Sequence, residues 1–128
     1  METITVENPT LYDKAVEDAS KKYKVVFVLI TGEVDKATGE SWCPSCRVAA
    51  PILKKLLPTV PDSVLLYCPV VKSEYRGNPS YPYRKKPGVD GGVPTLHWIN
   101  APSPMPPLGQ CAQEDYVAMW LEMVKEQL

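Results

Sequence analysis

Apolar residues near the start of the chain recur three and four positions apart, the spacing of one face of an α-helix. Asn8 is a typical residue at a helix start, and Pro9 suits the first helical position because its missing amide is not needed there. The pattern continues to Lys21 and Lys22. It predicts an amphipathic helix of about three turns, whose apolar side is formed by Leu11, Tyr12, Ala15, Val16 and Ala19.

Two later segments are continuously apolar. Residues 25–30 read VVFVLI, and a second run covers residues 64–68 and continues as Pro69, Val70 and Val71. Such short, mostly β-branched runs are typical of strands buried on both faces of a parallel sheet. Between them, residues 43–57 carry apolar positions at helical spacing and predict a helix that Pro51 should kink. Strand, helix and strand in this order predict a right-handed βαβ unit.

The rest of the chain adds one strand and one helix. Residues 95–99 predict a strand, and residues 114–127 predict a closing amphipathic helix. Residues 72–92 and 101–110 are rich in proline, glycine and polar residues, so we expect long surface loops there. No repeat or domain boundary is visible. The 128 residues therefore predict a single α/β domain spanning 1–128.

Composition narrows the class of protein. Hydrophobic residues make up 45% and charged residues 23%, as in globular proteins. A net charge of −1 gives no field that would attract a polyanion or an anionic membrane, so we expect neither nucleic acid nor membrane binding. The N-terminus lacks a signal-peptide pattern, and no apolar run approaches the roughly eighteen residues of a membrane span. We expect a cytoplasmic monomer, a setting in which disulfides rarely persist.

Residues 40–46 read ESWCPSC and hold two of the four cysteines. In a helix that starts at Cys43, free backbone amides and the positive end of the helix dipole favour a thiolate at that residue. Cys46, one turn further in, should be more buried and remain a thiol. The spacing lets Cys43 attack a substrate disulfide and lets Cys46 displace the substrate thiol. Pro44 would stiffen the turn, and Trp42 would shield the sulfur.

Two other interpretations of the pair stay open at this point. It could be half of a zinc site, but the remaining ligands would have to come from Cys68, Cys111 and His97, without a second close pair. It could also be chance spacing of structural thiols. We expect Cys68 to be a buried, inert thiol and His97 a residue of the strand surface. For Cys111, just before the last helix, the sequence leaves an exposed, oxidisable thiol open as an alternative to a buried one.

A second motif lies ahead of the last strand, where residues 91–95 read GGVPT. In the thioredoxin fold a cis-proline loop at this place faces the Cys-x-x-Cys pair, and the order of the elements also resembles the thioredoxin superfamily over nearly the whole chain. Further motifs are similar to the thioredoxin domain-containing protein 17 family, whose length also agrees: Thr31-Gly32, an inserted loop over 33–41, SWCPSC, Leu66-Tyr67-Cys68, Tyr83-Arg84-Lys85 and Val93-Pro94-Thr95.

The resemblance implies a thioredoxin-like fold with a central mixed β-sheet flanked by helices on both faces. It also implies a cytosolic reductase of protein disulfides and cystine that binds no cofactor and receives electrons from NADPH through thioredoxin reductase. Carried over by position, Cys43 is the attacking and Cys46 the resolving cysteine, and Trp42, Pro44 and Ser45 complete the motif. Pro94 becomes the cis-proline, and Val93 the residue whose backbone pairs with an extended substrate.

An alternative of another class is a partner-binding adaptor on the same scaffold, for which the enlarged loops would be the evidence. We expect the inserted loop and the 72–92 segment to border the redox site and to select partners.

The chain departs from these relatives in two places. The family usually has aspartate where this chain has Ser45. Thioredoxin has a buried aspartate on the strand before the motif, which helps to deprotonate the resolving cysteine, whereas residues 25–30 contain no acid. Glu33, Asp35 and Glu40 in the inserted loop could substitute for it, but acids in loops are usually solvated. The sequence therefore assigns no general base.

Overall fold

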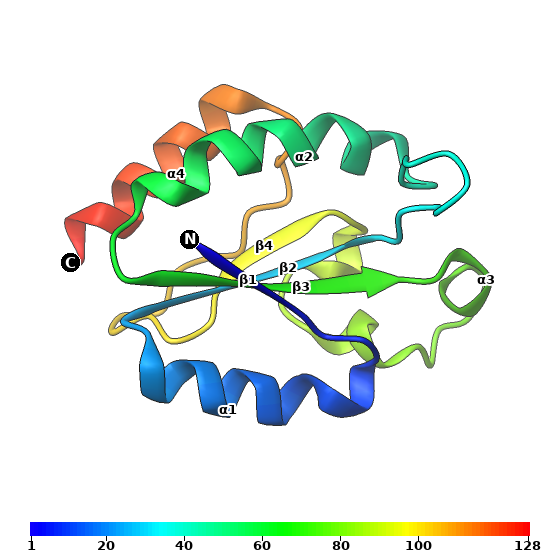
Figure 1. Cartoon of the computed structure of the whole chain (residues 1–128), viewed down its shortest axis with the longest axis horizontal. Coiled ribbons are helices and arrows are strands. Elements are labelled where there is room, and N and C mark those ends of the chain that lie inside the picture. Colours follow the sequence, from blue (N-terminus) through cyan, green and yellow to red (C-terminus); the bar gives the residue numbers. More distant parts are fainter.

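A computed structural model describes all residues, 1–128, and is built around a mixed four-stranded sheet. The strands are β1 (Glu2–Thr5), β2 (Val25–Gly32), β3 (Ser63–Val70) and β4 (Thr95–Trp98), arranged in the order β1-β3-β2-β4. Both β1 and β2 run parallel to β3, and β4 runs antiparallel to β2. Figure 1 shows the sheet nearly edge-on between two layers of helices.

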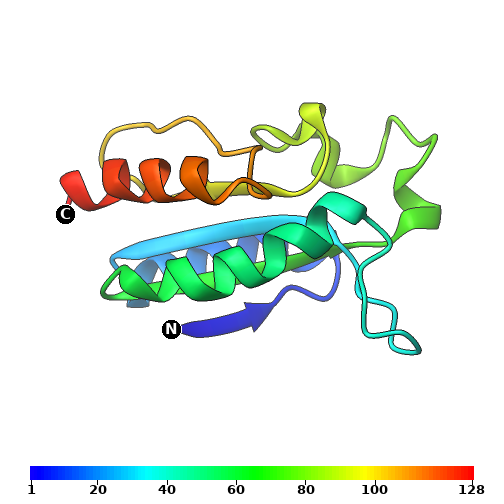
Figure 2. The same cartoon turned by 90° about the horizontal axis from the view of Figure 1, so that it is seen from above.

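The helices are α1 (Tyr12–Lys22), α2 (Pro44–Leu56), α3 (Lys72–Tyr75) and α4 (Glu114–Glu126). Helices α2 and α4 lie side by side over one face of the sheet, and α1 covers the other (Figures 1 and 2). This arrangement confirms the predicted fold class, and the three long helices are those that the apolar spacing predicted. None of the helices is long and apolar enough to cross a membrane.

Local sequence explains where α1 starts. The Asn8 side chain accepts a hydrogen bond from the Thr10 amide at 3.0 Å, and Pro9 opens a 3₁₀ turn over Pro9–Leu11 that leads into α1. An Asn at a helix start satisfies an amide that has no partner within the helix. Leu11 remains 48% exposed because it lies in this turn rather than on the buried side of α1.

Strand β2 is buried along its whole length, which explains its continuous apolar sequence. Its residues alternate between two hydrophobic clusters. Val25, Phe27 and Leu29 pack in a cluster with α2, α4 and β4, whereas Val26, Val28 and Ile30 pack in a cluster with α1. Full burial of each such side chain contributes roughly 1.5–3 kcal/mol, so β2 is the centre of the fold's stability.

The structure corrects the expectation that residues 72–92 are only a surface loop. They contain α3 and two 3₁₀ turns, Pro82–Lys85 and Val89–Gly91. Tyr81, Tyr83 and Val89 are buried in the cluster on the α1 side of the sheet. The aromatic side chains are separated by charged residues and prolines, so no helical or strand period reveals their burial.

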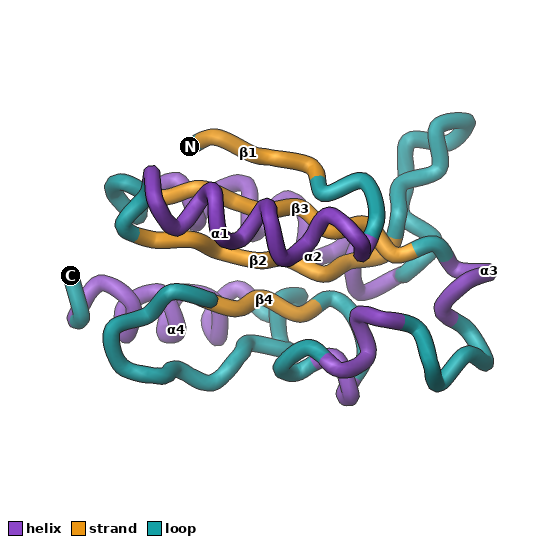
Figure 3. Tube along the Cα trace, turned by 90° about the horizontal axis from the view of Figure 1, so that it is seen from below, coloured by secondary structure: helices purple, strands orange, loops and turns teal.

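The segment before α4 also departs from a simple surface loop. It is a long loop that runs back alongside β4 in Figure 3, and Met105 and Leu108 within it are buried. Leu108 and Leu96 exchange backbone hydrogen bonds of 2.7 and 2.9 Å, which attach the loop to the free side of β4. The edge strand β1 was also not predicted, because it is short and none of its residues is buried.

Candidate active site

The N-terminus of α2 holds the first cysteine of the motif. Cys43 has extended backbone angles (φ −97°, ψ 117°) and caps α2, and Pro44 occupies the first helical position. The Cys46 amide lies 3.4 Å from the Cys43 sulfur, and the Arg47 amide donates to the Cys43 carbonyl at 3.1 Å. The sulfur therefore occupies the place of a capping oxygen, where free amides and the helix dipole favour a negative charge.

Cys46 lies in the first turn of α2 and faces the sheet. Its sulfur accepts a hydrogen bond from the Gly32 amide at 3.2 Å. Cys46 is 3% exposed and Cys43 6% exposed, so the second cysteine is the more buried by a small margin. Burial, followed by the hydrogen bond with Cys43, raises the pKa of Cys46 to about 11, and the Thr31 side chain and the Gly32 amide lower it by less. At neutral pH Cys46 is a thiol.

The loop before β4 reaches the same point of the molecule. The peptide bond between Val93 and Pro94 is cis. The Cys43 sulfur lies 3.7 Å from the Val93 carbonyl oxygen, and the Thr95 hydroxyl donates to the Gly92 carbonyl at 2.8 Å. The structure thus brings together the two motifs that the sequence analysis singled out. The roles of Val93 and Pro94 in binding a substrate stay predictions.

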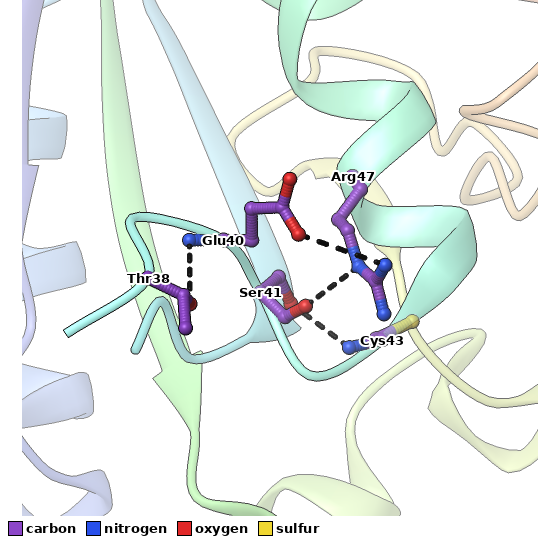
Figure 4. Close-up of polar contacts among 5 residues, drawn as sticks. All are labelled: Thr38, Glu40, Ser41, Cys43 and Arg47. Carbon is purple, nitrogen blue, oxygen red and sulfur yellow. Dashed lines mark hydrogen bonds and ion pairs between the residues drawn. The ribbon is translucent and has the colours of Figure 1, made fainter. Parts of the chain in front are cut away.

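Ser41 and Arg47 attach the inserted loop to the start of α2, as Figure 4 shows. The Ser41 hydroxyl donates to the Gly32 carbonyl at 2.9 Å and accepts from the Cys43 amide at 3.2 Å. Arg47 Nε donates to the Ser41 carbonyl at 2.8 Å, and its Nη1 lies 3.8 Å from Glu40 Oε2. Neither residue was predicted from the sequence. A serine just before a helix is a capping signal that could have identified Ser41, but nothing in the sequence marks Arg47.

Trp42 precedes Cys43, and its indole ring makes three contacts. Its indole Nε1 donates to the Val70 carbonyl at 2.8 Å. The Tyr75 ring centroid lies 6.1 Å away, and the Arg76 guanidinium carbon lies 5.9 Å from the Trp42 ring. An open groove of about 730 Å³ runs past Trp42 between the inserted loop and α3. The inserted loop and the 72–92 segment therefore both border Trp42, and their role in selecting partners stays a prediction.

Charged residues line this groove on both sides. The inserted loop contributes Glu33, Asp35 and Lys36, and the α3 side contributes Lys72 and Arg76. A substrate or partner that reaches Cys43 over Trp42 would meet charges of both signs.

Ser45 is exposed on the first turn of α2, between the two cysteines. We expect Ser45→Asp to slow the alkylation of Cys43 by iodoacetamide at neutral pH by about two- to tenfold, because a nearby like charge disfavours the thiolate. The matched control is Ser45→Asn, which has the same shape without the charge and should react like the wild type. Alkylation of the aspartate variant at an equal or higher rate would contradict the prediction.

The other two thiols lie in the core. Cys68 and Cys111 are both 0% exposed, and burial raises the pKa of each to about 12. This agrees with the expectation for Cys68. The structure decides the question left open for Cys111 in favour of burial: Cys111 packs in the cluster with α2 and α4, and its thiol donates to the Leu108 carbonyl at 3.3 Å. Leu108, three residues earlier, is buried in the same cluster.

The structure also bears on the alternative of a metal site. All four cysteines are free, and no group of three or more His, Cys, Asp or Glu side chains converges so that it could hold a metal ion. His97 is half-buried in β4, and burial lowers its pKa. Neither His97 nor the two core thiols forms a ligand set with Cys43 and Cys46.

Several curated proteins are similar to this chain. Thioredoxin domain-containing protein 17 of Danio rerio is 32% identical over 119 residues, which span 92% of this chain and 93% of that protein. Its counterpart of Mus musculus is 33% identical over 109 residues, with 84% and 85% covered. Acireductone dioxygenase of Leishmania infantum is 33% identical over 100 residues, which span 73% of this chain. The chain spans only 29% of the length of that dioxygenase.

Solved structures of thioredoxins share the fold. The reduced thioredoxin pre-protein of Schistosoma mansoni superposes with a TM-score of 0.61 at 19% identity, and all of both chains is covered. Oxidised thioredoxin O1 of Arabidopsis thaliana gives a TM-score of 0.55 at 18% identity, covering all of this chain and 98% of the other. At this level of identity the likeness establishes the thioredoxin fold.

The family assignment rests on a match along almost the whole chain. The sequence profile of the thioredoxin domain of thioredoxin domain-containing protein 17-like proteins matches residues 5–123. Together with the animal relatives, this match supports a redox function of the thioredoxin type in general terms. The chain belongs to the thioredoxin domain-containing protein 17-like family of thioredoxin domains.

Proposed function

We propose that this protein is a cytoplasmic thiol-disulfide oxidoreductase that reduces protein disulfides and cystine through Cys43 and Cys46. Thioredoxin reductase would recharge the pair with electrons from NADPH, and residues 1–128 would act as one monomeric domain without a bound cofactor. The observation that carries the proposal is the position of the Cys43 sulfur. It caps α2, lies beside the Val93 carbonyl, and has Cys46 one turn behind it.

The chemistry proceeds by two thiol-disulfide exchanges. The Cys43 thiolate attacks one sulfur of the substrate disulfide, which breaks, and the first substrate thiol leaves. Cys46 then loses its proton and attacks the Cys43 sulfur, so that a Cys43–Cys46 disulfide forms and the second substrate thiol leaves. The substrate gains two electrons and the protein loses two. Reduction by thioredoxin reductase, with NADPH as the electron donor, restores both thiols.

The surroundings of Cys43 supply the geometry for the first exchange. The Cys46 amide and the positive end of α2 stabilise the Cys43 thiolate before it attacks the substrate disulfide. The Val93 backbone borders the sulfur and suits an extended substrate segment, which would bind by main-chain hydrogen bonds as an added strand does. The charged groove at Trp42 would then distinguish among substrates.

An NADPH-consumption assay with thioredoxin reductase tests the proposal, with insulin and cystine as separate substrates. We expect the wild type to consume NADPH with each substrate, and oxidised protein alone to consume about one equivalent. Turnover with neither substrate would reject the reductase and favour an adaptor that binds partners through the groove at Trp42. Metal analysis of the purified protein provides the second arm: stoichiometric zinc that Cys43→Ser abolishes would contradict a free redox pair.

A further inference from the structure

The buried position of Cys46 creates a problem of proton transfer in the proposed mechanism. Cys46 must lose a proton before it attacks the mixed disulfide, because the thiolate is the nucleophile. Cys46 is 3% exposed, and its sulfur lies between α2 and β2. Strand β2 has no acidic residue that could accept the proton. The proton must therefore leave through another part of the surroundings.

A cavity of about 270 Å³ lies directly behind Cys46. It extends between β2, β3, α2 and the inserted loop, and besides Cys46 its lining includes five polar side chains: Thr31, Glu40, Ser41, Arg47 and Tyr67. Water occupies a cavity when the space is large enough and polar partners are available, and each molecule takes about 30 Å³. This cavity satisfies both conditions, so water can connect Cys46 to the cavity mouth.

Tyr67 is the one polar residue of β3 in this lining, and its hydroxyl makes no hydrogen bond to any protein atom. In the alternation of β3, Leu65 and Tyr67 face the cluster with α2 and α4, whereas Leu66 and Cys68 face the cluster with α1. Tyr67 is half-buried. The only fully buried side-chain oxygen or nitrogen without a hydrogen-bond partner is the Tyr83 hydroxyl, so the unpaired Tyr67 hydroxyl retains access to solvent. A hydroxyl can accept one hydrogen bond and donate another at the same time.

We propose that this cavity is the proton exit of Cys46 and that the Tyr67 hydroxyl relays the proton through cavity water to the mouth. Tyr67 is a positioning residue, since it acts on Cys46 through water. The inference rests on the proposed function, because the proton is released when Cys46 resolves a mixed disulfide. It also distinguishes the three acids of the inserted loop: Glu40 lines this cavity, whereas Glu33 and Asp35 line the groove at Trp42.

The groups around the cavity are consistent with a relay rather than with a buried base. Burial raises the pKa of Tyr67, and the charges of a Cys46 thiolate and of Glu33 raise it further, so Tyr67 is protonated at neutral pH. The ionisable and charged groups near Cys46 or Tyr67 on each packed element are Tyr67 on β3, Cys43 and Arg47 on α2, Glu33 and Glu40 in the inserted loop, and Cys111 before α4. None of them is a buried carboxylate, so the proton passes on to solvent.

The resolving step can be measured alone with the aromatic disulfide dithionitrobenzoate. Attack by Cys43 releases one equivalent of thionitrobenzoate and leaves a mixed disulfide, and attack by Cys46 releases a second equivalent. Cys68 and Cys111 are fully buried and should not contribute. We expect Tyr67→Phe to leave the rate of the first phase unchanged and to slow the second phase by about tenfold at neutral pH. This factor is smaller than the rate enhancement of about 10²- to 10⁴-fold that a direct general acid or base contributes. The difference should narrow as the pH rises and hydroxide removes the proton.

Tyr83→Phe is the matched control. The Tyr83 hydroxyl is also without a partner, but it is buried on the opposite face of the sheet, so its loss should not change the second phase. A second phase equally fast in Tyr67→Phe, or slowed by the same factor at every pH, would overturn the relay. Absence of a second phase in the wild type would instead refute the proposed reductase. Cys46→Ser, which lacks the resolving thiol, is the reference for a reaction with only the first phase.

Discussion

Cys43→Ser should abolish disulfide reduction, with a loss of NADPH-linked turnover on the order of 10⁴-fold or more, the scale on which removal of a covalent nucleophile acts. A serine hydroxyl at the start of α2 would keep the capping geometry, since it is the usual capping group at that position. It would remain protonated, however, and would not attack sulfur. The expected result is a folded protein that does not reduce disulfides. Circular dichroism would show the fold, and the NADPH assay would show the loss of turnover.

Cys46→Ser should fail at a different step. Its Cys43 still attacks a disulfide, but no second thiol resolves the product, so the substrate stays attached through a mixed disulfide. Intact-mass measurement should find the adduct in this variant and not in Cys43→Ser. Cys68→Ala is the control, because it removes a buried thiol on the other side of the sheet and should retain turnover. Equal residual turnover in the two motif variants, without an adduct, would exclude the two-step mechanism.

The central part of the fold follows from the apolar pattern. Strand β2 is an uninterrupted apolar run because both of its faces are buried, and α2 shows a helical period because only one side of it is. These two elements place Cys43 at a helix start and at the end of a parallel strand. The position of the redox pair was therefore predictable from residues 25–57 and the motif.

The aromatic packing beside Trp42 could not be predicted from an apolar pattern. It is a row of aromatic rings whose neighbouring centroids lie 5.7 to 6.1 Å apart, and it runs through Tyr12, Tyr83, Tyr81, Tyr75 and Trp42. Arg84 stacks on Tyr75 at 3.9 Å, and Lys86 lies 4.2 Å from the Tyr12 ring. Contacts between segments decide this packing, so the local sequence of residues 72–92 resembles a loop although its tyrosines belong to the core.

The cavity behind Cys46 depends on tertiary structure even more strongly. Its lining combines residues of β2, β3, α2 and the inserted loop, and the loop closes over it because Ser41 and Arg47 attach the loop to α2. The sequence offered three loop acids as candidates for one role and gave no reason to prefer any. The fold of the loop separates them, since it directs Glu40 toward the cavity and the other two toward the groove.

Gly32→Ala should lower the rate of disulfide reduction by about 10²-fold, the cost of displacing a reacting group by about 1 Å. A Cβ at Gly32 would lie 2.7 Å from Ser41 Oγ, 2.9 Å from Cys43 Cβ and 3.1 Å from Trp42 Cε2. Ser41 cannot turn aside freely, because its hydroxyl bonds to both the Gly32 carbonyl and the Cys43 amide. The turn that carries Cys43 must shift instead, which changes the position of the sulfur relative to the Val93 carbonyl and the Cys46 amide.

The same substitution at Gly109 is the control, because a Cβ there would meet no atom within 4 Å and the backbone does not require glycine. We expect Gly109→Ala to keep wild-type turnover. The rate of the first dithionitrobenzoate phase should fall in Gly32→Ala, since the misplaced group is Cys43 itself, and this separates its defect from that of Tyr67→Phe. If Gly32→Ala reacted at the wild-type rate in both phases, the close contact of β2 with the motif would not set the geometry of attack. The absence of a side chain at Gly32 thus matters to the site as much as the two sulfurs do. It allows the start of α2 to lie close to the end of β2.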